Sequence, residues 1–200
     1  QAIWLSGLCC IFPGAVGYWL TRNQRSGIKK REGYLIVALA WFTMTSVGMF
    51  PYLFSGIIPE LPKALFESIS GMTTTGASVL SDIEAAPKGF LFWRSLTQWI
   101  GGMGIIVLTV AIFPLLGFGG IELFVAEAPG PTSDKIHPRI SETAKRLWLI
   151  YVGLTGLLAV ILFCLDMNFY ESINHALTTM ATGGFSTRNA SMAAFDPSIL

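Results

Sequence analysis

Charged residues are scarce in this sequence. Lys, Arg, Asp and Glu make up 12% of the 200 residues, against about 25% in a typical soluble domain. Stretches without any of these four residue types cover 1–21, 33–59, 95–121 and 147–165. A helix that crosses a bilayer needs about 20 apolar residues. Because these stretches also lack the polar stripes of a soluble helical bundle, the sequence predicts an integral membrane protein with four spanning helices.

Cysteine and histidine are also few. The three cysteines lie in apolar stretches and form neither a disulfide framework nor a metal-binding spacing, so we expect small buried hydrophobic residues at Cys9, Cys10 and Cys164. The two histidines fall on opposite sides of the predicted membrane, which counts against the alternative of a membrane enzyme. A net charge of +1 without a long basic block gives no reason to expect a nucleic-acid partner.

The basic residues are distributed unevenly among the connecting segments. Nine of the thirteen Lys and Arg residues lie in segments 21–32 and 118–146. Short cytoplasmic loops of membrane proteins carry an excess of Lys and Arg. We therefore expect these two segments in the cytoplasm, and the segments 53–92 and 166–200 on the outer side.

Both outer segments contain a stretch too short to cross a membrane. Residues 62–72, which begin with a proline suited to a helix start, and residues 169–180 each predict a helix of about 16 Å, half of a bilayer. Small, hydroxyl-rich loops follow at 73–78 and 181–186. Such a backbone can stay at membrane depth only inside protein or beside water. The prediction is an all-α polytopic membrane protein with potassium-channel-like repeats of span, pore helix, re-entrant pore loop and span.

The layout occurs twice, so the sequence contains an internal repeat. Thr75-Gly76 matches Thr182-Gly183 at an offset of 107 residues, whereas residues 66–69 resemble residues 170–173 at an offset of 104. From these two offsets we expect about three extra residues in the second short helix. The second unit lacks its closing span in this sequence, and we interpret the chain as a fragment.

The Thr-Gly loops fit the chemistry of a potassium filter. An ion in such a filter exchanges its hydration shell for rings of backbone carbonyls. Glycine permits the backbone angles that expose consecutive carbonyls, and threonine adds a hydroxyl. A short helix entering from outside also directs its partially negative C-terminal end at the ion. Ordinary turns are the alternative, but the pattern occurs twice, each time after a half-helix.

Other polar residues near the loops have two interpretations each. Glu67 is costly at membrane depth unless it is paired or hydrated, so it either supports the loop or attracts cations. Arg94 and Gln98 lie one turn apart at the outer end of a span, where they are either interfacial anchors or contacts of the loop backbone.

A few further residues complete the predicted site. We expect a solvated rim at Asp82 and Glu84, and a packed, hydrogen-bonded side chain at His175. Three glycines in the span after the first loop favour close helix packing, with a hinge as the alternative: Gly101, Gly102 and Gly104.

The sequence resembles the Trk family of bacterial potassium uptake subunits in the stretches 30–34, 67–77, 98–106, 126–131, 138–145 and 183–187. The resemblance implies four repeats preceded by a helical hairpin. This chain would hold the second hairpin helix and a basic loop (1–32), the first repeat (33–117), a cytoplasmic linker (118–146) and an incomplete second repeat (147–200). The third and fourth repeats are absent from it.

The resemblance also implies function and partners. The transported ion would be K⁺, with no organic cofactor in this chain, and the subunit would lie in the bacterial inner membrane with segments 53–92 and 166–200 in the periplasm. It would form a homodimer and bind a cytoplasmic nucleotide-binding regulatory subunit of the TrkA type. A sodium- and potassium-permeable transporter and a non-conducting scaffold subunit are the alternatives. The implied K⁺-coordinating residues are Thr74, Thr75, Gly76, Ala77, Ala181, Thr182, Gly183 and Gly184.

Overall fold

The computed structural model describes residues 2–22, 30–112 and 136–195, and their regular structure is entirely helical. This confirms the all-α prediction for the described residues. The helices are α1 (Ala2–Thr21), α2 (Lys30–Gly48), α3 (Phe50–Phe54), α4 (Leu61–Met72), α5 (Lys88–Ile112), α7 (Ile136–Cys164) and α8 (Phe169–Met180), with a short 3-10 helix at Ser191–Ala194.

Among the described residues, three helical segments are long and apolar enough to cross a membrane: Trp4–Thr21, Leu35–Phe54 and Glu142–Cys164. Helix α5 has 25 residues and is therefore about 37 Å long; the predicted span 95–121 extends beyond the described residues. Large apolar side chains on the long helices are exposed, and lipid is the environment that can cover them. Cys9 and Cys164 are exposed too, so the expectation of buried cysteines is wrong for both; the side chain of Cys10 lies outside the described part.

The second span is interrupted near its C-terminal end. Helix α2 ends at Gly48, and α3 begins at Phe50 with Pro51 in its first turn. Proline lacks the N–H that would continue the helical hydrogen bonds. The indole N–H of Trp93 on α5 donates to the Gly48 carbonyl at 3.2 Å, so a neighbouring helix satisfies a backbone group at the break.

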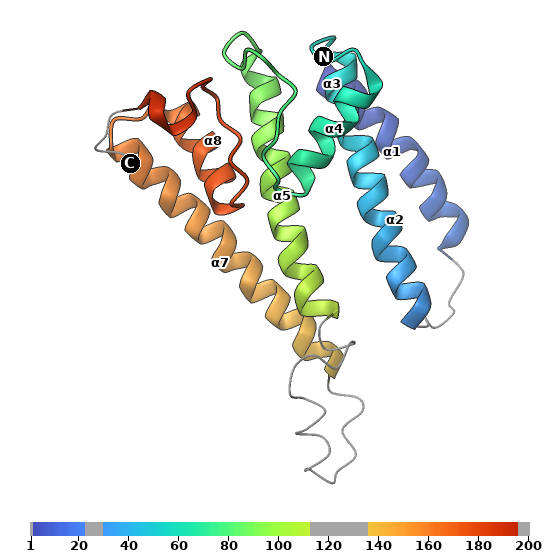
Figure 1. The fold of residues 1–200 in the computed structure, drawn as a ribbon. Coiled ribbons are helices and arrows are strands. Elements are labelled where there is room, and N and C mark those ends of the chain that lie inside the picture. Colours follow the sequence, from blue (N-terminus) through green and yellow to red (C-terminus); the bar gives the residue numbers. More distant parts are fainter. Residues whose placement is uncertain (1, 23–29, 113–135, 196–200) are drawn as a thin grey trace.

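Helix α5 lies at the centre of the arrangement. The two short helices are enclosed by long ones: α4 packs against α2 and α5, and α8 packs against α5 and α7 (Figure 1). Both short helices begin at the same end of the molecule and run toward its middle, while the C-terminal ends of α1 and α5 lie at the opposite end (Figure 1). The molecule thus has two units of long helix, half-helix and loop that share α5 as a neighbour.

The two half-helices are equally long, with 12 residues each. The expectation of three extra residues in the second one is therefore wrong. Helix α4 starts one residue before the predicted 62–72 and has Pro62 in its first turn. Helix α8 starts at the predicted residue because the Asn168 side chain accepts the Glu171 backbone N–H at 2.9 Å, which satisfies one of the free donors of a helix start.

Candidate functional site: two re-entrant loops held by one helix

The loops that follow α4 and α8 have the same backbone conformation. Thr74 and Thr182 have φ angles of 55° and 53°, and Gly76 and Gly184 have φ angles of 78° and 80°. Left-handed conformations cost a threonine about 1–2 kcal/mol. They persist where the surrounding structure enforces them, and such residues cluster at functional sites.

Hydrogen bonds to the half-helices repeat with the same spacing. The N–H groups of Thr75 and Gly183 donate to the carbonyls of Ser70 and Thr178, at 2.9 and 2.8 Å. Each residue of the first loop is thus matched by a residue 108 positions later, and the first residues of α4 and α8 are also 108 positions apart. The predicted offset of 107 is therefore wrong, and the structural equivalent of Gly76 is Gly184.

The corrected register changes the set of equivalent loop residues. Residues 74–77 correspond to residues 182–185, whereas the resemblance had pointed to residues 181–184. Ala181 corresponds to Thr73; it is 5% exposed and would touch a Cβ at Gly102 of α5, whereas Thr182 and Gly184 are exposed. The residue that precedes Thr182 is therefore a packing contact of α5. Of the four residues 182–185, Thr182 and Gly184 are exposed, whereas Gly183 and Phe185 are buried.

Glu67, in the middle of α4, holds the outgoing limb of the first loop. Its side chain is fully buried. Its carboxylate accepts the Ser78 hydroxyl and the Val79 backbone N–H, both at 2.9 Å. Of the two predicted roles, the structure favours support of the loop over attraction of free cations.

His175 occupies the position of Glu67 in α8. Its Nε2 lies 3.5 Å from the Ser186 hydroxyl and 3.4 Å from the Thr187 hydroxyl, which are the equivalents of Ser78 and Val79. His175 is packed and hydrogen-bonded, as expected from the sequence, and its ring contacts Phe195 edge-on. Each half-helix therefore uses one central polar residue to hold its own loop, although the two residues differ in chemistry.

Arg94 of α5 contacts both loops. Its Nε donates to Glu67 at 2.8 Å and its Nη2 donates to the Ser78 hydroxyl at 3.0 Å. Toward the second loop, its guanidinium lies 4.1 Å from the centre of the Phe185 ring, and its Nη1 donates to the Ser186 carbonyl at 3.5 Å. With 1% exposure, Arg94 is no interfacial anchor; it is a buried loop contact whose charge Glu67 balances.

Gln98, one turn further along α5, contacts the backbone of the second loop. Its Nε2 donates to the Gly183 carbonyl at 2.8 Å, and its Oε1 accepts the Phe185 N–H at 3.1 Å. The side chain is fully buried. Of the two interpretations of Gln98, the structure therefore favours the second, a contact of the loop backbone.

The glycines of α5 allow both half-helix ends to approach it closely. A Cβ at Gly101 would overlap the backbone carbonyl of Met72, and one at Gly102 would come within 3.1 Å of Ala181. Gly104 faces only the ring of a tryptophan on α2, at 3.3 Å. The first two glycines thus position the C-terminal ends of α4 and α8 beside each other.

At the end of the molecule where both half-helices begin, the two units are joined by a contact that we call the outer clasp, formed by residues 82–84 and 188–189. The Asn189 amide donates to Asp82 at 2.9 Å and accepts the Ile83 N–H at 2.7 Å. Arg188 lies 3.7 Å from Glu84. Asp82 and Glu84 are exposed, as expected for a rim, yet they pair with the second unit. The Asn189 amide also lowers the pKa of the Asp82 carboxyl below its ordinary value.

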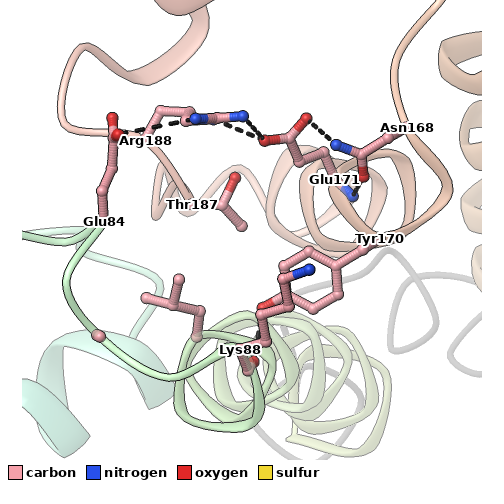
Figure 2. Close-up of a pocket in the computed structure, with 9 residues that line it drawn as sticks. Glu84, Lys88, Asn168, Tyr170, Glu171, Thr187 and Arg188 are labelled. Carbon is pink, nitrogen blue, oxygen red and sulfur yellow. Dashed lines mark hydrogen bonds and ion pairs between the residues drawn. The ribbon is translucent and has the colours of Figure 1, made fainter.

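A cavity of about 260 Å³ lies beside the clasp. Arg188 crosses it to reach Glu171 at 2.6 Å, and the Lys88 ammonium lies 5.6 Å from the Tyr170 ring (Figure 2). Because acidic and basic side chains alternate around the cavity, it has no strong preference for one charge sign. Among the described residues, no cluster of His, Cys, Asp and Glu could hold a metal ion through side chains.

Comparison with known proteins identifies the family. A family model described as TrkH, a cation transport protein, matches residues 1–200. This chain belongs to the TrkH family. The potassium uptake protein TrkH of Escherichia coli K12 is 50% identical over 186 residues, which cover 92% of this chain and 38% of that protein. TrkG of the same organism, also a Trk system potassium uptake protein, is 39% identical over 192 residues, 94% of this chain and 39% of that protein.

The fold of the chain is that of a solved TrkH structure. The crystal structure of the potassium transporter TrkH from Vibrio parahaemolyticus matches with a TM-score of 0.85 and 41% identity, over 99% of this chain and 39% of that one. The polytopic, re-entrant fold class expected from the sequence is thereby confirmed. The chain spans less than two fifths of the length of these TrkH-family relatives.

Several contacts of the site were not predicted from the sequence. Ser78 and Ser186 contact the central polar residues and Asn189 is part of the outer clasp, and no local sequence pattern indicates these contacts. A signal for the correct register did exist. At an offset of 108 the short stretches 72–78 and 180–186 share Met, Thr, Gly and Ser at alternate positions, whereas the offset of 107 aligns only the Thr-Gly pair.

Proposed function

We propose that this chain supplies two of the four loops of the selectivity filter of a bacterial potassium uptake subunit. The observation that carries the proposal is the pair of half-helices whose C-terminal ends meet at α5 and continue into loops with matching left-handed residues. The partially negative helix ends favour a cation at this point. Alternating left-handed residues let successive carbonyls face one side, as a dehydrated K⁺ requires.

We assign the K⁺-coordinating oxygens according to the corrected register. In the first loop they come from Thr74, Thr75, Gly76 and Ala77, and in the second loop from residues 182–185 in place of 181–184. Glu67, Arg94 and Gln98 position these loops without contacting the ion. The names of the relatives, all potassium uptake or transport proteins, support K⁺ as the transported ion.

The remaining parts of the proposal concern the complete subunit. Two further repeats would close the ring of loops around the ion path. The subunit would lie in the inner membrane, with the outer clasp in the periplasm and the segments 21–32 and 118–146 in the cytoplasm, as the distribution of basic residues indicates. We propose a homodimer regulated by a cytoplasmic nucleotide-binding subunit of the TrkA type, on the family resemblance alone.

The proposal is tested by transport. The full-length subunit should restore growth of potassium-uptake-deficient bacteria at low K⁺ and should carry Rb⁺, a K⁺ tracer. A non-conducting scaffold would do neither, and a sodium-permeable transporter would carry Na⁺ equally well.

Gly76 is the residue whose change should alter ion preference. Its φ is 78°, and a Cβ would overlap the Gly183 carbonyl of the neighbouring loop. We expect Gly76→Ser to lower the preference for K⁺ over Na⁺ about tenfold, which corresponds to about 1.4 kcal/mol. Competition of Na⁺ with Rb⁺ uptake measures this.

A matched control is Gly56→Ser. Gly56 has a similar φ of 70°, but a Cβ there would meet nothing within 4 Å. The substitution imposes the same kind of backbone strain outside the loops and should leave ion preference unchanged. Equal effects of both substitutions, or none from Gly76→Ser, would contradict the assignment of the filter.

A further inference from the structure

The Gln98 side chain holds the backbone of the second loop at two points. Its amide joins the Gly183 carbonyl and the Phe185 N–H, so both ends of the carboxamide are used.

The lack of a side chain at Gly183 leaves the space that Gln98 occupies. Unlike Gly76 and Gly184, it has no left-handed φ, so its backbone angle alone does not require glycine. A Cβ at this position would overlap the side-chain amide of Gln98. The absence of a side chain at residue 183 is explained by the approach of Gln98, which makes the two residues a matched pair.

A hydrogen bond to a carbonyl oxygen changes what that oxygen offers a cation. The N–H of Gln98 places the positive end of a dipole beside the Gly183 oxygen, with 2.8 Å between nitrogen and oxygen, and opposes the field of that oxygen. Coulomb energy varies inversely with distance. The smaller Na⁺, which approaches an oxygen more closely, therefore loses more from a weakened field than K⁺ does.

We propose that Gln98 is a specificity-determining positioning residue: its amide N–H weakens the Gly183 carbonyl as a ligand and thereby favours K⁺ over Na⁺. The inference rests on the proposed function, because it requires that the Gly183 carbonyl faces the transported ion. Gln98, a residue of the first repeat, thus contributes to the ion preference of the second loop.

The test replaces Gln98 in the full-length subunit by glutamate and by methionine. An ionised glutamate at position 98 lacks the donor and adds negative charge beside the Gly183 carbonyl. We expect Gln98→Glu to lower the preference for K⁺ over Na⁺ about tenfold at alkaline pH, a change of about 1.4 kcal/mol, measured by Na⁺ competition with Rb⁺ uptake. At acid pH the protonated carboxyl regains an O–H donor, and the preference should recover.

Gln98→Met keeps the length of the side chain but has neither donor nor charge. It should lower the preference at every pH, by less than the ionised variant. The titratable and charged groups on α5 and on the helices packed against it near this position include Arg94 on α5, Glu67 on α4, His175 on α8 and Tyr151 on α7. All of them are present in both variants, so a pH response seen only in Gln98→Glu comes from position 98.

Ser95→Ala is the matched control. Ser95 is a buried polar residue of α5 whose hydroxyl donates within its own helix, to the Leu91 carbonyl at 3.2 Å, and its loss should leave ion preference unchanged. Unaltered preference in both Gln98→Met and alkaline Gln98→Glu would overturn the role of Gln98. Failure of the unaltered subunit to carry Rb⁺ would instead contradict the proposed function.

Discussion

Arg94 is the side chain on which both loops depend at the scale of single residues. It is buried, it pairs with Glu67 on the first half-helix, and it reaches the Phe185 ring and the Ser186 carbonyl of the second loop. A buried ion pair contributes little net stability when both partners are present, but removal of one partner leaves an uncompensated charge. The effect of a substitution here therefore depends on what happens to Glu67.

We expect Arg94→Met to lower the free energy of unfolding by about 3–5 kcal/mol, the cost of an unpaired buried charge. The double variant with Glu67→Gln removes that charge and should recover part of the loss, since effects of contacting residues are not additive. Denaturant unfolding of the full-length subunit in detergent measures both.

The control for this prediction is Arg146→Met. Arg146 pairs with Glu142 at 2.7 Å, but their side chains are 74% and 64% exposed, and such pairs contribute about 0–1 kcal/mol. A loss in the double variant as large as the sum of the two single losses would contradict the explanation by unpaired charge.

Single residues also show why the repeat register was mispredicted. Gly183 and Gly184 look alike in the sequence, but Gly184 has the left-handed backbone and Gly183 makes room for Gln98. Glu67 and His175 perform the same task with different chemistry, so residue similarity hides their equivalence. The similar stretches at an offset of 104 instead align Glu67 with Glu171, which lies in the first turn of α8 and serves its cap.

At the scale of elements, more of the structure is predicted from the sequence than at the scale of single residues. Charge-free stretches located the spans, because a bilayer excludes charge, and the half-helices were recognised because they are too short to cross. The break between α2 and α3 was not predicted. Pro51 is a local signal for this break, but the compensating hydrogen bond from the indole of Trp93 to the Gly48 carbonyl, 45 residues away, has none.

Helix α5 is the element that brings the two half-helices together, through its glycines. We expect Gly101→Ala to lower the free energy of unfolding by about 1–3 kcal/mol, the usual cost of overpacking, because its Cβ would overlap the backbone carbonyl of Met72. Rb⁺ uptake should fall as well, since the displaced residue directly precedes the first loop. Denaturant unfolding and tracer uptake measure the two effects.

Gly153→Ala on α7 is the matched control. A Cβ at Gly153 would meet nothing within 4 Å, and alanine within a helix is favoured over glycine by about 0.5–1 kcal/mol. This variant should be neutral or slightly stabilised, with unchanged uptake. If Gly101→Ala behaved like Gly153→Ala, α5 would not be the surface that positions the half-helices.

At the scale of the whole molecule, the two units are joined twice: in the interior by Arg94 and Gln98, and by the outer clasp at the end where the half-helices begin. The outer joint depends on pH because the Asn189 amide lowers the pKa of Asp82. A carboxyl with a lowered folded-state pKa stabilises the fold above its ordinary pKa of 3.8. That contribution is lost as the pH falls through the folded-state pKa.

We therefore expect Asn189→Ala to lower the melting temperature of the full-length subunit at neutral pH, and the deficit to shrink as the pH falls below about 4. Thermal unfolding in detergent at a series of pH values measures it. Asp82→Asn keeps the size of the side chain but cannot ionise, and in this background the acid-dependent part of the deficit should vanish. A deficit of equal size at neutral and strongly acid pH would mean that Asn189 holds the clasp through the Ile83 N–H alone.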